Sequence, residues 1–368
     1  MNYRNTSASA IFMVLLALVF VPFMPLMAQR GKQAPVLSDT LKSSTFSGLK
    51  WRGIGPAFTS GRVSTIAVNP ENFSEYYVGA GSGHVWKTVN NGTTFTPIFD
   101  NYGAYAIGFI AIDPNNSNVV WVGTGENTHQ RALGYGNGVY RSDDGGLSWK
   151  NMGLKESRQI GKIVIDPRNS DVVYVAAEGS VWGPGGDRGL YKTSDGGKTW
   201  ERVLFISENT GVNHITMDPR NPDVLYATSE QRRRHFFTKI GGGPESAVYK
   251  TTDAGKTWNK LTNGLPSGHV GGGSIEVSPA NPDIVYFIVE AADGKGGFYR
   301  STNKGASWSR MSDYTSSGQY FNIIVPDPVN PDKVFALDVV SKVTYDGGRT
   351  WKNLGLNKRH VDDHCLWI

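Results

Sequence analysis

Residues 142–149 read Ser142-Asp143-Asp144-Gly145-Gly146-Leu147-Ser148-Trp149, and five further segments of the chain carry the same phrase with small changes. The shared pattern is Ser/Thr-x-Asp-x-Gly-x-Ser/Thr-Trp. Its closing aromatic residues lie 43 to 58 residues apart, at Phe95, Trp149, Trp200, Trp258, Trp308 and Trp351. A spacing near 50 residues is typical of repeat architectures, in which each repeat is one supersecondary unit.

Three short runs of β-branched and aromatic residues precede the phrase in each repeat, bounded by Pro, Asn, Asp and Gly. In one repeat they are residues 163–165, 172–175 and 190–192. Such runs indicate strands, and a fourth strand starts at the Trp. Four antiparallel strands per repeat make one propeller blade. We therefore expect an all-β propeller of four-stranded antiparallel blades, with six blades present and a seventh begun.

The residues of the repeated phrase are expected to have structural roles at a hairpin turn. Its Asp accepts backbone hydrogen bonds, its second Gly allows a positive φ, and its Trp packs between neighbouring sheets. A calcium-binding or catalytic role for the carboxylates is the alternative. The four clean copies supply the structural residues Asp144, Gly146, Trp149, Asp195, Gly197, Trp200, Asp253, Gly255, Trp258, Asp346, Gly348 and Trp351.

The N-terminal residues resemble a leader rather than part of the fold. Residues 1–28 combine Arg4, an apolar stretch too short to span a bilayer and a cleavage site after Ala28, which predicts a signal peptide. A retained membrane anchor is the alternative. We expect residues 29–47 to be a linker and residues 48–368 to form the propeller. The mature protein would then be secreted, periplasmic or on the cell surface.

Charge and cysteine content exclude some classes of partner. The formal net charge is +5 and the basic residues form no sustained stripe, so nucleic-acid binding is not expected. Cys365 is the single cysteine, so no disulfide can form within the chain. After removal of the leader, no membrane span is expected. No cofactor is expected.

Both ends of the repeat region predict an incomplete ring. Residues 51–56 align with the fourth strand of a blade, yet no copy of the phrase precedes them. Residues 360–368 begin a new blade and stop in its first strand. We therefore expect the chain to be truncated at its C-terminus, with the missing part of the same chain as a structural partner.

The phrase is similar to the Asp-box, or bacterial neuraminidase repeat, of sialidases, xyloglucan-specific endoglucanases and the sortilin-type receptor propeller. The chain most resembles bacterial secreted relatives of the sortilin-type propeller, often described as glycosyl hydrolases. The resemblance covers residues 48–368 and rests on the repeated phrase, residues 51–56, the Asp-Pro-x-Asn-Pro-Asp turn at 218–223 and residues 360–362. It implies a propeller fold, which is compatible with many activities.

Two departures bear on the activity that the resemblance implies. Sialidases carry an Arg-Ile-Pro stretch on the first strand, and no such stretch occurs here. Xyloglucanase-type enzymes place a catalytic Asp in a first-blade loop, whereas the matching residues 79–84 contain no carboxylate. The resemblance therefore favours binding over hydrolysis of sugars.

Long irregular loops are expected on one face of the propeller, at residues 123–138, 176–189, 229–246 and 290–297. Function usually lies in such loops. Acidic residues recur near the second strands and would form a ring near the mouth of the central channel: Glu126, Glu178, Glu230, Glu290 and Asp338. They could perform glycosidic acid–base chemistry, bind a cation or basic peptide, or simply pair with Arg and accept hydrogen bonds from the next blade.

Other residues of these loops could contact a ligand. Arg232, Arg233 and Arg234 beside Phe236 and Phe237 could grip an anionic or aromatic ligand, or form a solvated turn whose Phe pair packs on the rim. The remaining candidates are His129, Arg131, Trp182, Asp187 and Arg188. The spacing of His residues predicts no metal site.

Two functions follow as hypotheses. The first is an exported binding module that recognises a protein, peptide or glycan on the long-loop face. The second is a xyloglucanase-like glycoside hydrolase that acts on a polysaccharide with carboxylates at the channel mouth. A scaffold for other parts of the protein is a third possibility.

Overall fold

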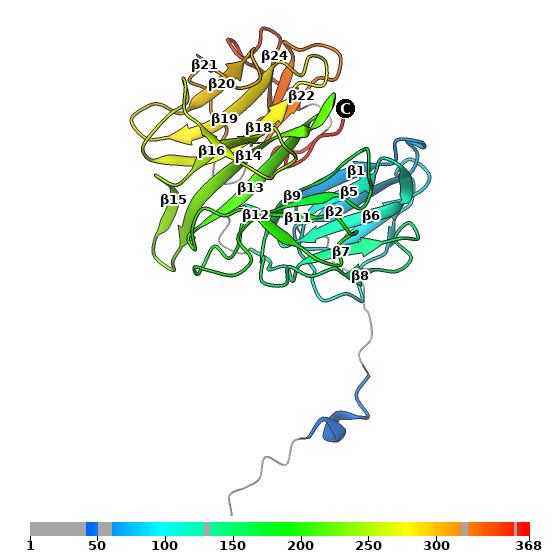
Figure 1. Cartoon of the computed structure of the whole chain (residues 1–368). Coiled ribbons are helices and arrows are strands. Elements are labelled where there is room, and N and C mark those ends of the chain that lie inside the picture. The colour runs from blue at the N-terminus through cyan, green and yellow to red at the C-terminus, as the bar shows by residue number, and fades with distance from the viewer. Residues whose placement is uncertain (1–41, 51–60, 129–132, 318–322, 357–358) are drawn as a thin grey trace, which may run out of the picture. The chain divides into compact units, whose positions relative to one another are not determined.

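The computed structural model describes residues 42–50, 61–128, 133–317, 323–356 and 359–368. The chain divides into two compact units, Met1–Ala57 and Phe58–Ile368. The described residues of the first unit include one short 3₁₀ helix, η1 (Ser43–Phe46), and the second unit carries the strands (Figure 1). Across the described ranges, no helix has the length and apolar character needed to cross a bilayer. The predicted leader and residues 51–60 lie outside the described residues.

In the second unit, antiparallel strands pair in chain order within each sheet. The first strands are β1 (Val63–Val68), β5 (Ile107–Asp113), β9 (Ile160–Ile165), β13 (Thr210–Asp218), β18 (Val270–Val277) and β22 (Ile323–Pro326). The second strands are β2 (Tyr76–Ala80), β6 (Asn116–Thr124), β10 (Val173–Ala177), β14 (Asn221–Arg234), β19 (Val285–Ala291) and β23 (Val334–Leu337). The third strands are β3 (Val85–Thr88), β7 (Val139–Ser142), β11 (Gly189–Thr193), β16 (Ala247–Thr251), β20 (Gly297–Ser301) and β24 (Lys342–Thr344). The fourth strands are β4 (Thr96–Pro97), β8 (Lys150–Asn151), β12 (Glu201–Leu204), β17 (Asn259–Leu261), β21 (Ser309–Ser312) and β25 (Lys352–Asn353).

One additional strand, β15 (Lys239–Gly243), joins two of these sheets. It pairs with the end of β14 on one side and with Val270 and Gly271 of β18 on the other, so the sheet becomes nine-stranded. The other described strands form four separate four-stranded sheets. An all-β fold of four-stranded antiparallel sheets is therefore confirmed.

The apolar core lies between successive sheets. Tyr77 and Val85 of the first sheet cluster with Val120 and Val122 of the second, and Trp149 completes the same cluster. Every residue of β10 is buried, as expected for a strand covered on both faces. Burial of these apolar surfaces between sheets is the main term that holds the sheets together.

The repeated turn is held by its own polar side chains. Asp144 accepts hydrogen bonds from Ser142 Oγ at 2.7 Å, Ser148 N at 2.9 Å and Ser148 Oγ at 2.5 Å. Gly146 donates its N–H to Ser142 Oγ and adopts a φ of 92°. These donors lower the pKa of the Asp144 carboxyl to about 2, with Ser148 as the main cause. The carboxylate therefore has a structural role in its turn.

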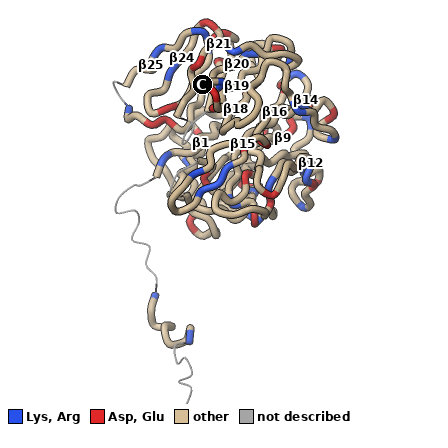
Figure 2. Tube along the Cα trace, turned by 90° about the vertical axis from the view of Figure 1, so that its left-hand side faces the viewer, with Lys and Arg blue, Asp and Glu red and all other residues tan. Residues whose placement is uncertain are grey.

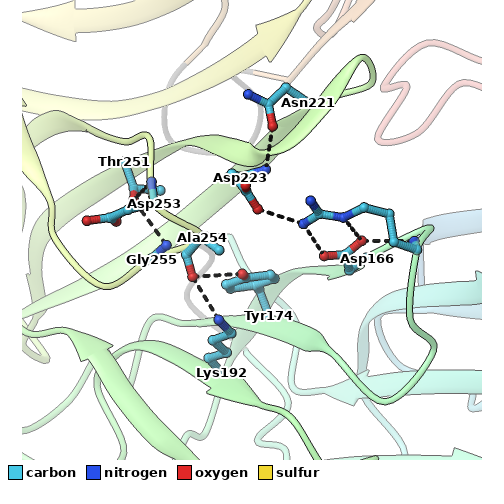
Figure 3. Close-up of polar contacts among 10 residues, drawn as sticks. Asp166, Tyr174, Lys192, Asn221, Asp223, Thr251, Asp253, Ala254 and Gly255 are labelled. Carbon is cyan, nitrogen blue, oxygen red and sulfur yellow. Dashed lines mark hydrogen bonds and ion pairs between the residues drawn. The ribbon is translucent and has the colours of Figure 1, made fainter.

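A repeated turn also attaches to the preceding sheet. Tyr174 Oη and Lys192 Nζ both donate to the carbonyl oxygen of Ala254, at 2.9 and 2.8 Å, and Figure 3 shows them converging on it. Tyr226 and Lys250 contact the Lys304 carbonyl in the same way. The sequence predictions assigned no such contact to these Tyr and Lys residues, although they recur at one position of the second and third strands.

We expect Asp346→Ala to lower the free energy of unfolding by about 1–2 kcal/mol, because backbone and hydroxyl donors of the turn lose their acceptor. Asp346→Asn should be nearly neutral. The natural Asn303 accepts Ser301 Oγ and Ser307 N and donates to Ser307 Oγ in the same geometry. Urea unfolding of the two variants measures the difference. Equal stability of Asp346→Ala and the wild-type protein would contradict the structural role.

Acid should weaken the same turn. The pKa of Asp346 is lowered to about 2 in the native state, although burial opposes the effect of its Thr350 and backbone donors. Because the native carboxyl binds its proton less tightly than the unfolded chain does, its contribution is present above about pH 4. This contribution is lost as pH falls towards 2, and it should be missing from the Asp346→Asn variant.

Two regions differ from the sequence predictions. Residues 229–246 are not an irregular loop, because β14 continues to Arg234 and pairs with β15 as a hairpin. Residues 359–368 form no strand, and Cys365 Sγ instead contacts the carbonyl of Val63 at 3.5 Å. The first strand of a seventh blade is therefore not formed by this segment. Basic and acidic residues alternate along the Cα trace of the second unit without gathering in one long stretch of either charge (Figure 2).

Candidate functional site

A cavity of about 390 Å³ lies among the first strands of all the described sheets. Residues of β1, β5, β9, β13, β18 and β22 line it, together with Glu126, Glu230, Arg232 and His364. The volume is in the range of small-molecule sites. The cavity is therefore the central channel of the sheet arrangement, and its charged residues are the first candidates for a functional site.

Glu126 lines this cavity and forms an ion pair with Arg62. Its side chain is buried and accepts hydrogen bonds from Nε and NH2 of Arg62, the latter at 3.1 Å. Gly81 lies against the same carboxylate, and a Cβ at Gly81 would stand 2.7 Å from Glu126 Oε1. The negative charge of Glu126 is therefore balanced locally by Arg62.

A second polar cluster lines the cavity on three successive first strands. Lys162 Nζ of β9 contacts Glu276 Oε1 of β18, and His214 Nε2 of β13 lies 3.3 Å from the same oxygen. Ser274 Oγ is 3.4 Å from His214 Nε2. Burial, helped by Lys162, holds the pKa of His214 well below its ordinary value. The His is therefore neutral, and both Ser and Glu approach the same ring nitrogen, which is not the arrangement of a Ser-His-acid triad.

This Lys-His-Glu cluster was not among the sites predicted from the sequence. The available signal was a charged residue within a run of apolar strand residues, as in Gly161-Lys162-Ile163 and Ile275-Glu276-Val277. Such residues face the channel while their neighbours face the cores between sheets. The pattern identifies channel-facing positions, but it does not say which of them meet.

Glu178 and Arg232 form a buried pair beside the cavity. Their exposed fractions are 0% and 2%, and Glu178 Oε1 lies 3.3 Å from Arg232 Nε without hydrogen-bond geometry. Among the described residues, neither carboxylate oxygen of Glu178 has a hydrogen-bond partner. Burial raises the pKa of Glu178 to about 7, against the opposing effect of Arg232 and with a contribution from Glu230. Arg232 also donates to Gln159 Oε1 at 3.1 Å.

Arg188 fastens the loop that follows β10. Its guanidinium donates to the carbonyl oxygens of Glu178 and Gly183 at 2.6 Å and also to that of Ser180. The side chain is fully buried, and burial lowers its pKa to about 10. Arg188 therefore positions the loop and is not available to a ligand.

The neighbouring loop residues are nearer to solvent. Trp182 is 39% exposed, and Asp187 Oδ2 accepts the N–H of Glu156 at 2.9 Å. Arg233 is half-buried and donates to Asn209 Oδ1 at 2.8 Å. Arg234 N donates to the Val181 carbonyl at 2.8 Å, which fixes the β14–β15 hairpin to the loop of the preceding sheet.

The predicted ring of acids is spread over different environments. Glu126 and Glu230 line the central cavity, whereas Glu290 borders a separate open cavity of about 760 Å³ with Arg310 and Asp313. Asp338 accepts hydrogen bonds from Tyr314 Oη and Ser317 N, both at 3.3 Å. His129 and Arg131 lie outside the described residues. In the described part of the chain, no three His, Cys, Asp or Glu side chains are grouped to hold a metal ion.

Comparison with known families shows the family to which this chain belongs. A family model described as Sortilin, neurotensin receptor 3 (Sortilin-Vps10) matches residues 137–267 and 188–335, which together span more than half of the chain. The chain belongs to the Sortilin-Vps10 family. The matched part of this Sortilin-Vps10 chain contains the Glu178–Arg232 pair, the Lys162 cluster and the β14–β15 hairpin.

Individual proteins are similar to this Sortilin-Vps10 chain at low identity. Xyloglucanase Xgh74A of Acetivibrio thermocellus is 24% identical over 343 residues, which cover 83% of this chain and 39% of the xyloglucanase. The chain thus spans well under half of the length of that relative.

Solved structures share the fold. The GH74 xyloglucanase of Xanthomonas campestris has a TM-score of 0.53 at 15% identity and covers 82% of this chain and 54% of its own. YCF48 bound to D1 peptide has a TM-score of 0.52 at 14% identity and covers 80% and 82%. The sortilin-like, propeller-type architecture predicted from the sequence is therefore confirmed.

Proposed function

We propose that this chain is an exported Asp-box propeller that acts as a binding module and recognises a protein, peptide or glycan on its long-loop face. The pairing of two of the predicted acids with Arg carries this proposal. Glu126 is paired with Arg62, and Glu178 is buried against Arg232, so these two acids are held in structural pairs. The exposed side chains of this face, above all Trp182, are suited to contact a ligand instead.

The similar proteins support both protein and glycan as ligand classes. One solved neighbour is described as bound to a D1 peptide, and several curated relatives are xyloglucanases. The leader pattern of residues 1–28 supports export of the module. An exposed Trp can stack on a sugar or anchor a protein partner, and a neighbouring guanidinium adds a donor for carboxylates.

Glycan and peptide arrays test the proposal. We expect Trp182→Ala combined with Arg233→Ala to lower affinity for the retained ligand by about tenfold or more, because aromatic and Arg anchors carry most of the energy of such interfaces. The melting temperature should change little. Arg232 is left intact because it belongs to the buried pair. Lys198→Ala, in an exposed repeated turn, is the matched control. A double variant that binds every retained ligand as tightly as Lys198→Ala would contradict the proposal.

A glycoside hydrolase is the second candidate function. One observation favours it: the pKa of Glu178 is raised to about 7 beside the charge of Glu230, and general acids of glycosidases have raised pKa values. Against it, Glu178 is fully buried and does not line the cavity. Reducing-end release from xyloglucan that disappears in Glu230→Gln would establish hydrolysis. Release of no sugar by the wild-type protein would exclude it for this substrate.

A further inference from the structure

The turn between β14 and β15 presents two aromatic rings to solvent. Phe236 and Phe237 have exposed fractions of 102% and 90%, so neither packs on the rim as one interpretation of the sequence predicted. His235 N donates to the Thr238 carbonyl at 2.8 Å, which closes a tight turn, and the His235 ring stacks on Phe237 at 6.3 Å. Exposure of two adjacent Phe side chains in water is unfavourable unless something covers them.

The hairpin that carries these rings is anchored at its base. Arg232, Arg233 and Arg234 of β14 pair with Gly241, Ile240 and Lys239 of β15. The far end of β15 pairs with β18, and Arg234 N is bonded to Val181 in the preceding loop. Ladder hydrogen bonds on both sides therefore fix where the turn projects, and little conformational freedom would be lost when the rings are covered.

Positively charged residues flank the two rings on both strands of the hairpin. Residues 231–243 contain Arg232, Arg233, Arg234 and Lys239 and no Asp or Glu. Arg232 is buried against Glu178, whereas Arg233, Arg234 and Lys239 are half-buried beneath the tip. Glu290 and Glu230 interact electrostatically with Lys239. Glu230 lies on β14 and Glu290 on β19, so neither acid is part of the turn. The tip therefore combines an apolar end with a cationic base.

This combination fits one kind of surface best. A convex tip with two adjacent rings matches a fluid apolar layer, whereas a rigid protein partner would have to offer a pocket for each ring. Aromatic side chains are favoured at the boundary between headgroups and acyl chains, and cations just outside it attract anionic headgroups. We infer that the β14–β15 turn inserts Phe236 and Phe237 into a lipid bilayer that carries anionic headgroups, with Arg233, Arg234 and Lys239 at headgroup level.

This membrane contact goes beyond the proposed ligand binding, because it depends on Phe236 and Phe237 and needs neither Trp182 nor the channel, although Arg233 is common to both. Co-sedimentation of the whole protein with phosphatidylglycerol–phosphatidylcholine vesicles tests it. We expect binding to these vesicles, weaker binding to pure phosphatidylcholine, and a loss of about tenfold or more in the Phe236→Ser, Phe237→Ser double variant. Its melting temperature should equal that of the wild type, since the two rings are solvent-exposed.

Two further measurements keep the outcome unambiguous. Leu147→Ser removes an 85% exposed apolar side chain from a repeated turn and should leave vesicle binding unchanged. Arg233→Gln with Arg234→Gln should remove the preference for anionic vesicles. No binding of the wild-type protein to the anionic vesicles, or equal binding of the double Phe variant, would overturn the inference. A change in sedimentation coefficient caused by the double Phe variant, without vesicle binding, would assign the tip to an interface between copies of this chain.

Discussion

Replacing Arg232 with alanine is expected to lower the free energy of unfolding by about 3 to 5 kcal/mol, the usual cost of removing one partner of a buried ion pair. The side chain is 2% exposed, lies 3.3 Å from the Glu178 carboxylate and donates to Gln159. Its loss leaves Glu178 without its main compensating charge and creates a cavity between loops of three sheets. Urea unfolding of the whole protein measures the change.

The loss of unfolding free energy caused by Arg232→Ala should also depend on pH. Burial raises the pKa of Glu178 to about 7, so the native carboxyl holds its proton more tightly than the unfolded chain does. The contribution of this group to stability therefore falls as pH rises from about 4.5 to about 7 and then levels off. Without the opposing charge of Arg232, the pKa of Glu178 rises further, and the variant should continue to lose stability above pH 7.

Glu178→Gln combined with Arg232→Met is the matched control. It removes both charges, so it should be less destabilising than Arg232→Ala alone and should lack the pH dependence of this group. A mild, pH-independent effect of Arg232→Ala would show that the pair contributes little.

The second large effect is expected for Gly161→Ala, which should cost about 3 kcal/mol through overpacking. A Cβ on Gly161 of β9 would stand 1.9 Å from the carbonyl oxygen of Asn213 on β13. The added Cβ is fixed by the backbone of β9, and the oxygen belongs to the backbone of β13, so no rotation of a side chain can relieve the contact. The two sheets would have to separate at the wall of the channel, and thermal unfolding reports the resulting loss.

Gly355→Ala serves as the comparison, because no neighbouring atom lies within 4 Å of the added Cβ. We expect its melting temperature to stay within the error of the wild-type value. If Gly161→Ala and Gly355→Ala melted at the same temperature, the first strands would not be in the close contact that the structure describes.

Much of the fold could be predicted from local sequence. The repeated phrase predicts turns such as that of Asp144 because every bond within it joins residues no more than four positions apart. The strand runs predict β9 and β10 to within a few residues. Local hydrogen bonding and strand periodicity need no knowledge of distant residues.

The candidate site was less predictable. The sequence placed Glu126, Glu178 and Glu230 on one face. The ion-pair partners of Glu126 and Glu178 are Arg62 and Arg232, and Arg62 is 64 residues from Glu126. The Lys162–Glu276 contact joins residues 114 positions apart. No local pattern states which channel-facing side chains meet, because the closure of the sheets around the channel sets that pairing.

The β14–β15 hairpin was likewise predicted only in part from the sequence. From the sequence alone, residues 229–246 combine Arg and Phe in a segment interpreted as a loop, and its charge and aromatic content were already evident. Only the structure shows that β15 bridges to β18, that Arg232 is buried and that Phe236 and Phe237 remain outside.

The sequence by itself therefore determined the repeat, its turns and the all-β architecture, since these depend on short-range bonds and side-chain periodicity. The tertiary structure alone decided which charges are neutralised and which apolar groups stay exposed, since burial and ion pairing depend on residues that chain closure brings together.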